Sequence, residues 1–179
     1  MSQRYSFAWY NCNVLIGCLI LTTALSSPVI ADACSAARDD YINREPFGAY
    51  KLHRHAMNWA SARKVCRDEC AHLAVINSGA EARMLGEMVS NMGHIRAASH
   101  EGKVFIGIHD MFAEGEWVTV LDDSISAAGF TGWSNRWWGQ PDNYAGQNCG
   151  ALLDDGYLDD ENCGKTLAFI CKRPLANVQ

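Results

Sequence analysis

The chain has 179 residues, of which 49% are hydrophobic and 20% are charged. This length and composition are typical of a globular protein with one ordinary domain and exclude a wholly disordered chain. The formal net charge of −5, without a cluster of Lys and Arg, argues against nucleic-acid binding and suits a cationic ligand or partner.

The N-terminal residues 1–31 are predicted to be a secretory signal peptide. An apolar run from Val14 to Leu25 is followed by Ser26, Ser27, Pro28 and small residues, the order that precedes a cleavage site. The alternative is a membrane anchor, but about 12 apolar residues are short against the roughly 20 that span a bilayer. We therefore expect a secreted, extracellular protein without membrane insertion, and its mature part would carry a formal charge of −6.

Six cysteines remain in the predicted mature chain: Cys34, Cys66, Cys70, Cys149, Cys163 and Cys171. An even number in an exported protein indicates three disulfides, although the count alone leaves their connectivity open. Zinc is the alternative, because Cys66 and Cys70 lie four positions apart downstream of His53 and His55. No matching second pair of ligands supports zinc.

One domain is expected over residues 49–174, between a short polar segment at 32–48 and a tail at 175–179. The polar segment has no heptads and no other oligomerising repeat. In chain order the patterns predict a strand at 49–53, a helix at 59–69 capped by Asn58, a buried strand at 73–76 and a helix from about 78 to 92. Ser78 and Glu81 have the spacing of a capping box at the start of the second helix.

The second half of the domain predicts short strands around a long loop. Strands are expected at 104–108, 116–121 and 167–171, and an Asp-Gly turn predicts a hairpin of 151–153 with 157–158. Residues 129–148 form an irregular loop, and such long loops in compact domains usually carry function. Two helices followed by short strands indicate an α+β fold.

Two clusters of oxygen-bearing side chains lie in this half. Gln140, Asp142 and Gln147 belong to the long loop, and Asp159 and Asp160 follow the hairpin. They offer five oxygen ligands with three negative charges, and a calcium ion takes roughly six to eight oxygens. The alternative is a solvated turn region, for which Asp, Asn and Gly are equally typical.

The chain resembles the C-type lectin-like family over roughly residues 48–173. The matching pieces are the helix with Trp59 and Cys66, AHLAVINS (71–78), FIGI (105–108), EGEWVTV (114–120), WGQPDN (138–143), CGA (149–151) and FICKRP from residue 169. FIGIHD and GFTGWS resemble the insect branch, particularly the hemolymph lipopolysaccharide-binding lectins.

The resemblance implies two helices packed on short antiparallel sheets, with a long calcium-binding loop and disulfides. It implies the pairs Cys66–Cys171 and Cys149–Cys163. Cys34 and Cys70 are then expected to bridge each other and to fix the N-terminal segment to the first helix.

The resemblance also implies a ligand set. Gln140 and Asp142 hold the positions whose side chains, around a cis proline, ligate calcium and hydrogen-bond two sugar hydroxyls. Gln147, Asp159 and Asp160 hold the other ligand positions, and the family pattern has Glu at 147 and Asn at 159. The two exchanges keep the ligand charge at −3 but change the hydrogen bonding, because an amide can donate whereas a carboxylate only accepts.

The long loop carries Tyr144 and three tryptophans. Tyr144 is the candidate for stacking on a galactose-type sugar, with packing on the loop as its alternative. Trp133, Trp137 and Trp138 are expected to pack within the loop and the core. The family's auxiliary calcium site is not assigned.

The predicted function is that of a secreted, calcium-dependent lectin. The Gln-Pro-Asp triplet implies galactose-type or microbial glycans as partners, in insect innate immunity or its subversion by a parasitoid. Because no stalk supplies several copies, self-association is expected where avidity is needed. The alternative is a lectin-like fold that binds a protein without calcium or sugar. An enzyme is not expected, since no nucleophile–base set has a catalytic context.

Overall fold

A computed structural model of the chain describes residue 34 and residues 38–175, so the predicted signal peptide lies outside the described residues. The helices are α2 (Trp59–Asp68), α3 (Gly79–Ser90), α4 (Ile125–Ala128) and the 3-10 helix η1 (Arg136–Trp138). The strands are β1 (Ile42–Arg44), β2 (Gly48–Met57), β3 (His72–Leu73), β4 (Lys103–His109), β5 (Val118–Thr119), β6 (Cys149–Leu153), β7 (Leu158–Glu161) and β8 (Leu167–Arg173). None of the described helices is long and apolar enough to cross a membrane.

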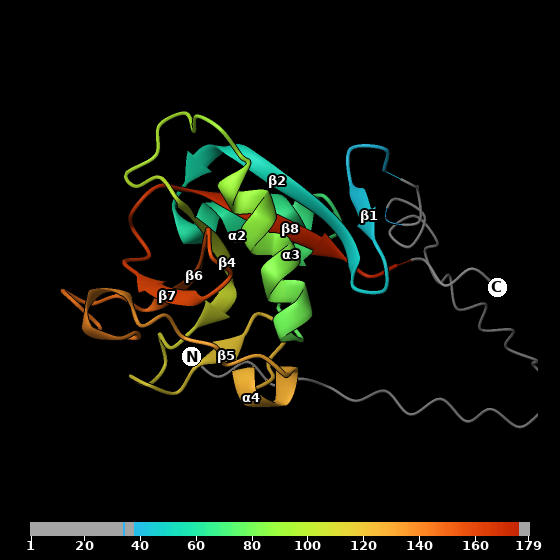
Figure 1. The fold of residues 1–179 in the computed structure, drawn as a ribbon. Coiled ribbons are helices and arrows are strands. Elements are labelled where there is room, and N and C mark those ends of the chain that lie inside the picture. Colours follow the sequence, from blue (N-terminus) through green and yellow to red (C-terminus); the bar gives the residue numbers. More distant parts are fainter. Residues whose placement is uncertain (1–33, 35–37, 176–179) are drawn as a thin grey trace, which may run out of the picture.

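All eight strands belong to one mixed sheet. Its main path has the order β1-β2-β8-β4-β6-β7, while β3 pairs with β8 and β5 with β4. The expected sheets were antiparallel, but β4 and β8 run parallel, with Val104 opposite Ala168 and Phe105 opposite Phe169. This difference arises because β8 enters the sheet between β2 and β4 instead of extending the β6–β7 hairpin. Figure 1 shows α3 lying across the long strands β2 and β8, with the β6–β7 hairpin at the other end of the sheet from β1.

Both long helices begin at the predicted caps. The Asn58 side chain accepts a hydrogen bond from the Ser61 backbone N–H at 2.9 Å, and Ser78 Oγ accepts from the Glu81 N–H at 3.2 Å. The Glu81 carboxylate departs from a capping box, because it accepts from the backbone N–H of Asn77 rather than that of Ser78. These bonds satisfy amide groups that a helix start leaves without partners.

Alternating residues of the central strands face two sides of the sheet. Ile106 and Ile170 pack on the side of α3, while their neighbours Phe105 and Phe169 pack on the side of α2. The described residues contain three disulfides: Cys34–Cys70, Cys66–Cys171 and Cys149–Cys163. These are the pairs that the resemblance implied, and the last one joins the start of β6 to the segment after β7.

Several segments differ from the sequence expectation. The strand expected at 116–121 is reduced to β5, and the short helix α4 was not expected. The strand expected at 73–76 is reduced to β3, although Ala74 still bonds both neighbouring strands, through Ile170 O at 2.8 Å and the Gly107 N–H at 2.9 Å. Strand β1 was missed because its three residues are exposed and too few to show the alternation that predicts a half-buried strand.

Candidate metal centre

The loop before β6 carries the Gln-Pro-Asp triplet, and the peptide bond between Gln140 and Pro141 is cis. The Gln140 backbone N–H donates to Ser134 O at 2.8 Å, and the Ser134 N–H donates to Leu158 O at 2.8 Å. The loop is thereby fixed at its base to the start of β7, the strand that carries the second cluster of carboxylates.

Asp160 holds the triplet in place. Its Oδ1 accepts from the Asp142 backbone N–H at 3.1 Å, and its Oδ2 accepts from the Asn143 N–H at 2.7 Å. Asp142 Oδ1 in turn accepts from the Tyr144 N–H at 2.9 Å. Two backbone amides therefore orient a carboxylate that is 1% exposed, 18 positions away in the chain from Asp142.

The side chain of Gln140 lies between three carboxylates. One terminal atom of its amide lies 3.2 Å from Asp159 Oδ1 and also against Asp160 Oδ1, and the other lies 3.4 Å from Asp142 Oδ2. With the amide nitrogen on the first side, Gln140 donates to both carboxylates. With the amide oxygen there, three oxygens converge, and such a convergence of hard oxygen donors fits calcium.

A lysine that the sequence did not point to enters this cluster. Lys103, at the start of β4, places its Nζ 2.8 Å from both Asp159 Oδ2 and Glu161 Oε2. Glu161 also accepts from the Gln147 amide, at 3.5 Å. The carboxylate of Glu161 therefore stands near the amide that replaces the usual Glu, while the ammonium of Lys103 neutralises the additional carboxylate of Asp159.

Burial and the ammonium group act in opposite directions on these acids. Burial raises the pKa of Asp159 and of Asp160, despite hydrogen bonds that favour their charged forms. For Glu161 burial is again the largest influence, but the hydrogen bond and charge of Lys103 with the other contacts hold its pKa below the ordinary value. A further positive charge would stabilise the ionised forms of Asp159 and Asp160 and so offset the cost of burying them.

The charge of the cluster fits a divalent cation. Asp142, Asp159, Asp160 and Glu161 contribute four carboxylates and Lys103 one ammonium, so the net charge is −3. This net charge equals the value expected from the sequence. It now includes the carboxylate of Glu161 and the ammonium of Lys103, which the sequence did not point to. The residues present therefore fit a calcium ion.

A second oxygen cluster lies beside the first. Asn148 Nδ2 donates to Asp110 Oδ1 at 3.0 Å, and Asn143 Nδ2 donates to Glu114 Oε2 at 2.6 Å. These contacts join the segment after β4 to the long loop. The amides supply donors to both carboxylates, so hydrogen bonds already satisfy this cluster.

The tryptophans of the loop divide into two kinds. Trp133 packs against Trp117 with ring centroids 4.7 Å apart, as expected. The expectation was wrong for the other two, because Trp138 is fully exposed and Trp137 is 55% exposed. Residues 135–138 are exposed, so neither indole is buried in the core. Tyr144 is also exposed.

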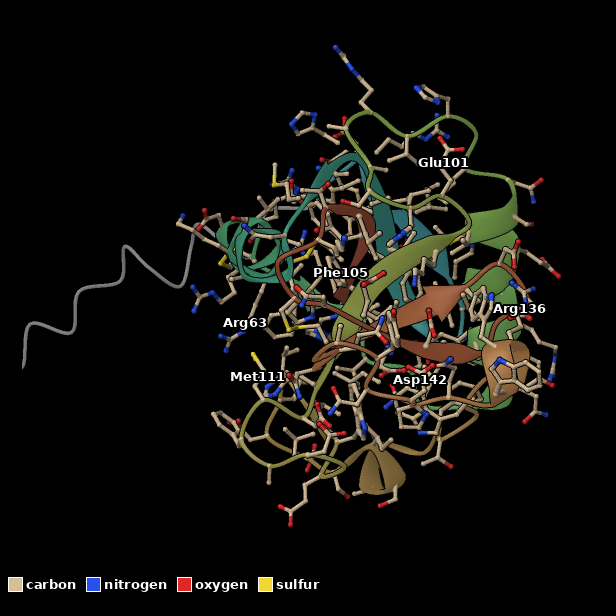
Figure 2. The ribbon with its side chains drawn as sticks, turned by 90° about the vertical axis from the view of Figure 1, so that its left-hand side faces the viewer. Arg63, Glu101, Phe105, Met111, Arg136 and Asp142 are labelled. Carbon is tan, nitrogen blue, oxygen red and sulfur yellow. A yellow bond between two sulfur atoms is a disulfide. The ribbon has the colours of Figure 1, made fainter. Side chains whose placement is uncertain are left out.

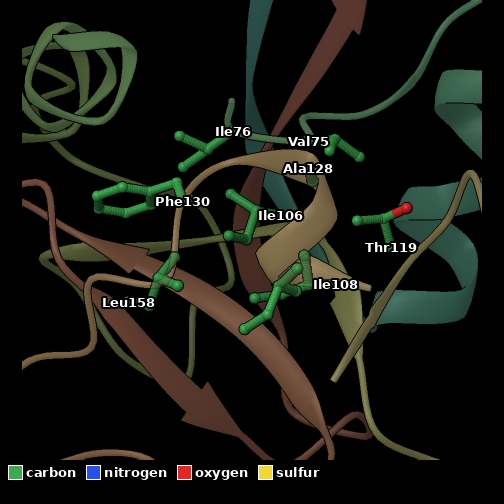
Figure 3. Close-up of a pocket in the computed structure, with 9 residues that line it drawn as sticks. Val75, Ile76, Ile106, Ile108, Thr119, Ala128, Phe130 and Leu158 are labelled. Carbon is green, nitrogen blue, oxygen red and sulfur yellow. The ribbon is translucent and has the colours of Figure 1, made fainter. Parts of the chain in front are cut away.

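A groove of about 930 Å³ passes over this region. Five predicted site residues line it: Gln140, Asp142, Tyr144, Gln147 and Asp159. In Figure 2, Asp142 lies below the β6–β7 hairpin and Arg136 at its edge, while Glu101 lies on a separate loop above them. The apolar pocket in Figure 3, between Ile76, Ile106 and Phe130, has only about 10 Å³ and is too small for a ligand.

The structure does not support the alternative of a zinc site, because the cysteines concerned form disulfides. His53, Glu69 and the Cys171 sulfur lie within 4.8 Å of one another, but Cys171 forms a disulfide with Cys66. Cys70 is likewise paired, with Cys34. Thiolates for a metal are therefore absent from these positions.

Residues 55–173 match the Lectin C-type domain family. The chain belongs to the C-type lectin family. It is 35% identical over 154 residues to the hemolymph lipopolysaccharide-binding protein of Periplaneta americana, a match that covers 86% of this chain and 59% of the cockroach protein. It is 30% identical to lectin BRA-3 of Megabalanus rosa over 131 residues, 70% of this chain and 71% of the barnacle lectin.

Solved structures of C-type lectins and of other proteins share the fold. The carbohydrate-recognition domain of the mouse scavenger receptor C-type lectin has a TM-score of 0.63 at 22% identity, covering 78% of this chain and 98% of that one. A calcium-independent type II antifreeze protein has a TM-score of 0.62 at 20% identity, covering 78% of this chain and 95% of that one. Residues 55–173 therefore match a non-enzymatic domain family whose relatives here include carbohydrate-binding lectins.

Proposed function

We propose that this C-type lectin is a secreted, calcium-dependent receptor for galactose-type or microbial surface glycans. The observation that carries the proposal is the convergence of Gln140, Asp142, Asp159 and Asp160 from two segments. The calcium ion would supply a positive charge that neutralises these carboxylates and accepts two sugar hydroxyls as ligands.

Each side chain has a role in this proposal. Asp160 and Asp159 hold the cation from β7, and Gln140 and Asp142 hold it from the loop. Gln147 faces the same groove but donates to Glu161, so it is proposed as a donor to the sugar or an outer ligand. Tyr144, exposed at the rim, provides a ring on which the apolar face of a galactose-type sugar can stack.

Lys103 changes how hydroxyls are recognised. The carboxylate of Asp159 can only accept hydrogen bonds, whereas an amide at this position could also donate. The ammonium of Lys103, 2.8 Å from Asp159 Oδ2, offers the missing donor at the same place. We therefore expect Lys103 to contribute to the choice of sugar.

The relatives suggest a role in innate immunity. The cockroach relative is named for binding lipopolysaccharide in hemolymph, and an insect defence lectin or a parasitoid's agent against one would use the same site. Secretion agrees with the three disulfides of the described chain, which form in oxidising compartments. Self-association is proposed as the source of avidity.

The test is retention on galactose-agarose with calcium and then with EDTA. Calcium-dependent retention, released by free galactose and lost in Asp160→Ala, is the expected result. Asp68→Ala on the exposed side of α2 is the control, because it removes a carboxylate from an exposed ion pair away from the groove. Retention that survives EDTA would contradict the proposal.

The second candidate is binding of a protein partner without calcium. The observation that favours it is Lys103, because an ammonium already neutralises Asp159 and Glu161. Isothermal titration with calcium decides between the two: a folded protein that takes up no calcium and binds no galactose would support the protein-binding candidate.

A further inference from the structure

Two tryptophans stand out on the segment between Ser134 and Gln140. Trp138 is fully exposed and Trp137 is 55% exposed. Leaving an indole in water forgoes the stabilisation that burial of a large apolar side chain contributes. Their exposure therefore calls for an explanation outside the folded chain.

The backbone beneath these indoles is held in an unusual conformation. Trp137 has φ 53° and ψ 43°, and Trp138 has φ 80°. Non-glycine residues rarely adopt positive φ, because the side chain then crowds the backbone. Two consecutive tryptophans with positive φ make this backbone locally strained, and contacts with the rest of the domain must hold it in place.

Arg136 fixes the start of the segment. The Arg136 backbone N–H donates to Ser134 Oγ at 3.0 Å. The Arg136 guanidinium bonds Asp154 Oδ1 at 2.9 Å and Asp155 Oδ2 at 2.7 Å, on the turn of the β6–β7 hairpin. The indoles are thus presented from a preorganised loop, which lowers the entropy lost when a ligand binds.

Both indoles line the same groove as Gln140 and Asp142. Lys103 Nζ lies 5.9 Å from the centroid of the Trp137 ring, a cation–π contact that orients this indole. The groove has about 930 Å³, at the upper end of the range for small-molecule sites and larger than one sugar ring requires.

We propose that Trp138, supported by Trp137, forms a second subsite that stacks on a sugar residue linked to the one held at Gln140 and Asp142. This inference rests on the proposed function and adds that the ligand is an internal or extended saccharide of at least two units. A sugar ring is chosen as occupant because the groove is continuous with the cation ligands. Arg136 and Asp154 line the groove beside the indoles, and polar groups of this kind can orient a sugar by hydrogen bonds to its hydroxyls.

The experiment titrates the protein, in calcium, with methyl β-galactoside and with β-1,4-linked galactobiose to galactotetraose. Wild-type affinity is expected to rise with chain length. Trp138→Ala should lower the tetraose affinity about 5- to 10-fold and leave that of methyl β-galactoside unchanged. Trp138→Phe should restore most of the loss, and Phe112→Ala, which removes another exposed aromatic ring outside the groove lining, should have no effect.

Equal affinity for the monosaccharide and the tetraose would overturn the second subsite while leaving the proposed function intact. So would an equal loss for both ligands in Trp138→Ala. If wild type binds none of these ligands, the galactose-type function itself fails, and the subsite with it. If the protein binds sugar-free phosphatidylcholine vesicles and this binding depends on Trp138, the ligand of Trp138 is a lipid surface, and the sugar subsite is refuted.

Discussion

Lys103 is the residue that most changes the interpretation of the site. The residue types at 140, 142, 159 and 160 predicted a converging set of oxygens, and these side chains lie together. Lys103 was not predicted because it is 56 positions from Asp159 in the chain, and its strand gave no signal of a buried ammonium. Only the pairing of β4 with β6, and of β6 with β7, brings the two together.

Replacing Lys103 by Met is expected to destabilise the calcium-free protein by about 3 kcal/mol, because it leaves buried carboxylates without their counter-charge. Calcium should raise the melting temperature of this variant more than that of wild type, since the cation supplies the lost positive charge. Thermal unfolding with calcium and with EDTA measures both effects.

Lys64→Met is the matched control. Lys64 forms an exposed ion pair with Asp68 on α2, and such pairs contribute less than about 1 kcal/mol. If Lys103→Met and Lys64→Met unfold alike in EDTA, the ion pairs of Lys103 do not stabilise the site.

A buried ion pair joins α3 to the sheet. The Glu81 carboxylate of α3 accepts from Lys172 Nζ of β8 at 2.7 Å and from the Tyr50 hydroxyl of β2 at 2.5 Å. The cap spacing predicted where α3 begins, but not that Glu81 turns inward. Its partners are far apart in sequence, and a residue in a capping box is normally solvated.

Glu81→Gln is expected to lower the free energy of unfolding by about 3 kcal/mol, because it leaves the Lys172 ammonium buried with neutral acceptors only. Tyr50→Phe should cost about 1 kcal/mol, the net contribution of one hydrogen bond. Urea denaturation measures both, and Asp68→Asn in the exposed pair is the control. A Glu81→Gln variant as stable as Asp68→Asn would refute the role of this pair.

The stability of the domain should depend on pH through histidines that the fold buries partly or fully. Burial lowers the pKa of His53, His72 and His109, and it outweighs the attraction of Glu69 for His53. An unfolded histidine takes a proton near pH 6.5, so the unfolded state binds more protons below that value. These histidines therefore cost no stability above about pH 6.5, and stability falls as the pH drops from there toward their lowered folded pKa values.

The slope should reach about 1.4 kcal/mol per pH unit for each histidine that stays neutral. The raised pKa values of Asp159 and Asp160 act with the opposite sign, but nearer the range in which free carboxyls titrate. Urea denaturation in EDTA between pH 7.5 and 5.5 measures the slope. His72→Gln should reduce it and the exposed His94→Gln should not; a slope unchanged in His72→Gln would contradict this assignment.

The α+β fold followed from local patterns, whereas the order of the strands did not. Helix caps and hydrophobic spacing located α2 and α3, and the Asp-Gly turn located the β6–β7 hairpin. The parallel pairing of β4 with β8 depends on contacts between distant segments, for which periodicity carries no signal. The exposed Trp138 was missed for a related reason, since aromatic residues in a loop usually pack and only the loop's path shows that this one does not.

The last strand of the sheet also lies near its middle, between β2 and β4. A chain still being synthesised therefore cannot complete the sheet until residues 167–173 have been made. Cys66 likewise cannot form its disulfide until Cys171, 105 positions later in the chain, has been synthesised. Until then the edges of β2 and β4 are open to pairing with other chains. Biogenesis of this lectin thus depends on keeping a half-built sheet and an unpaired thiol protected until the final strand arrives.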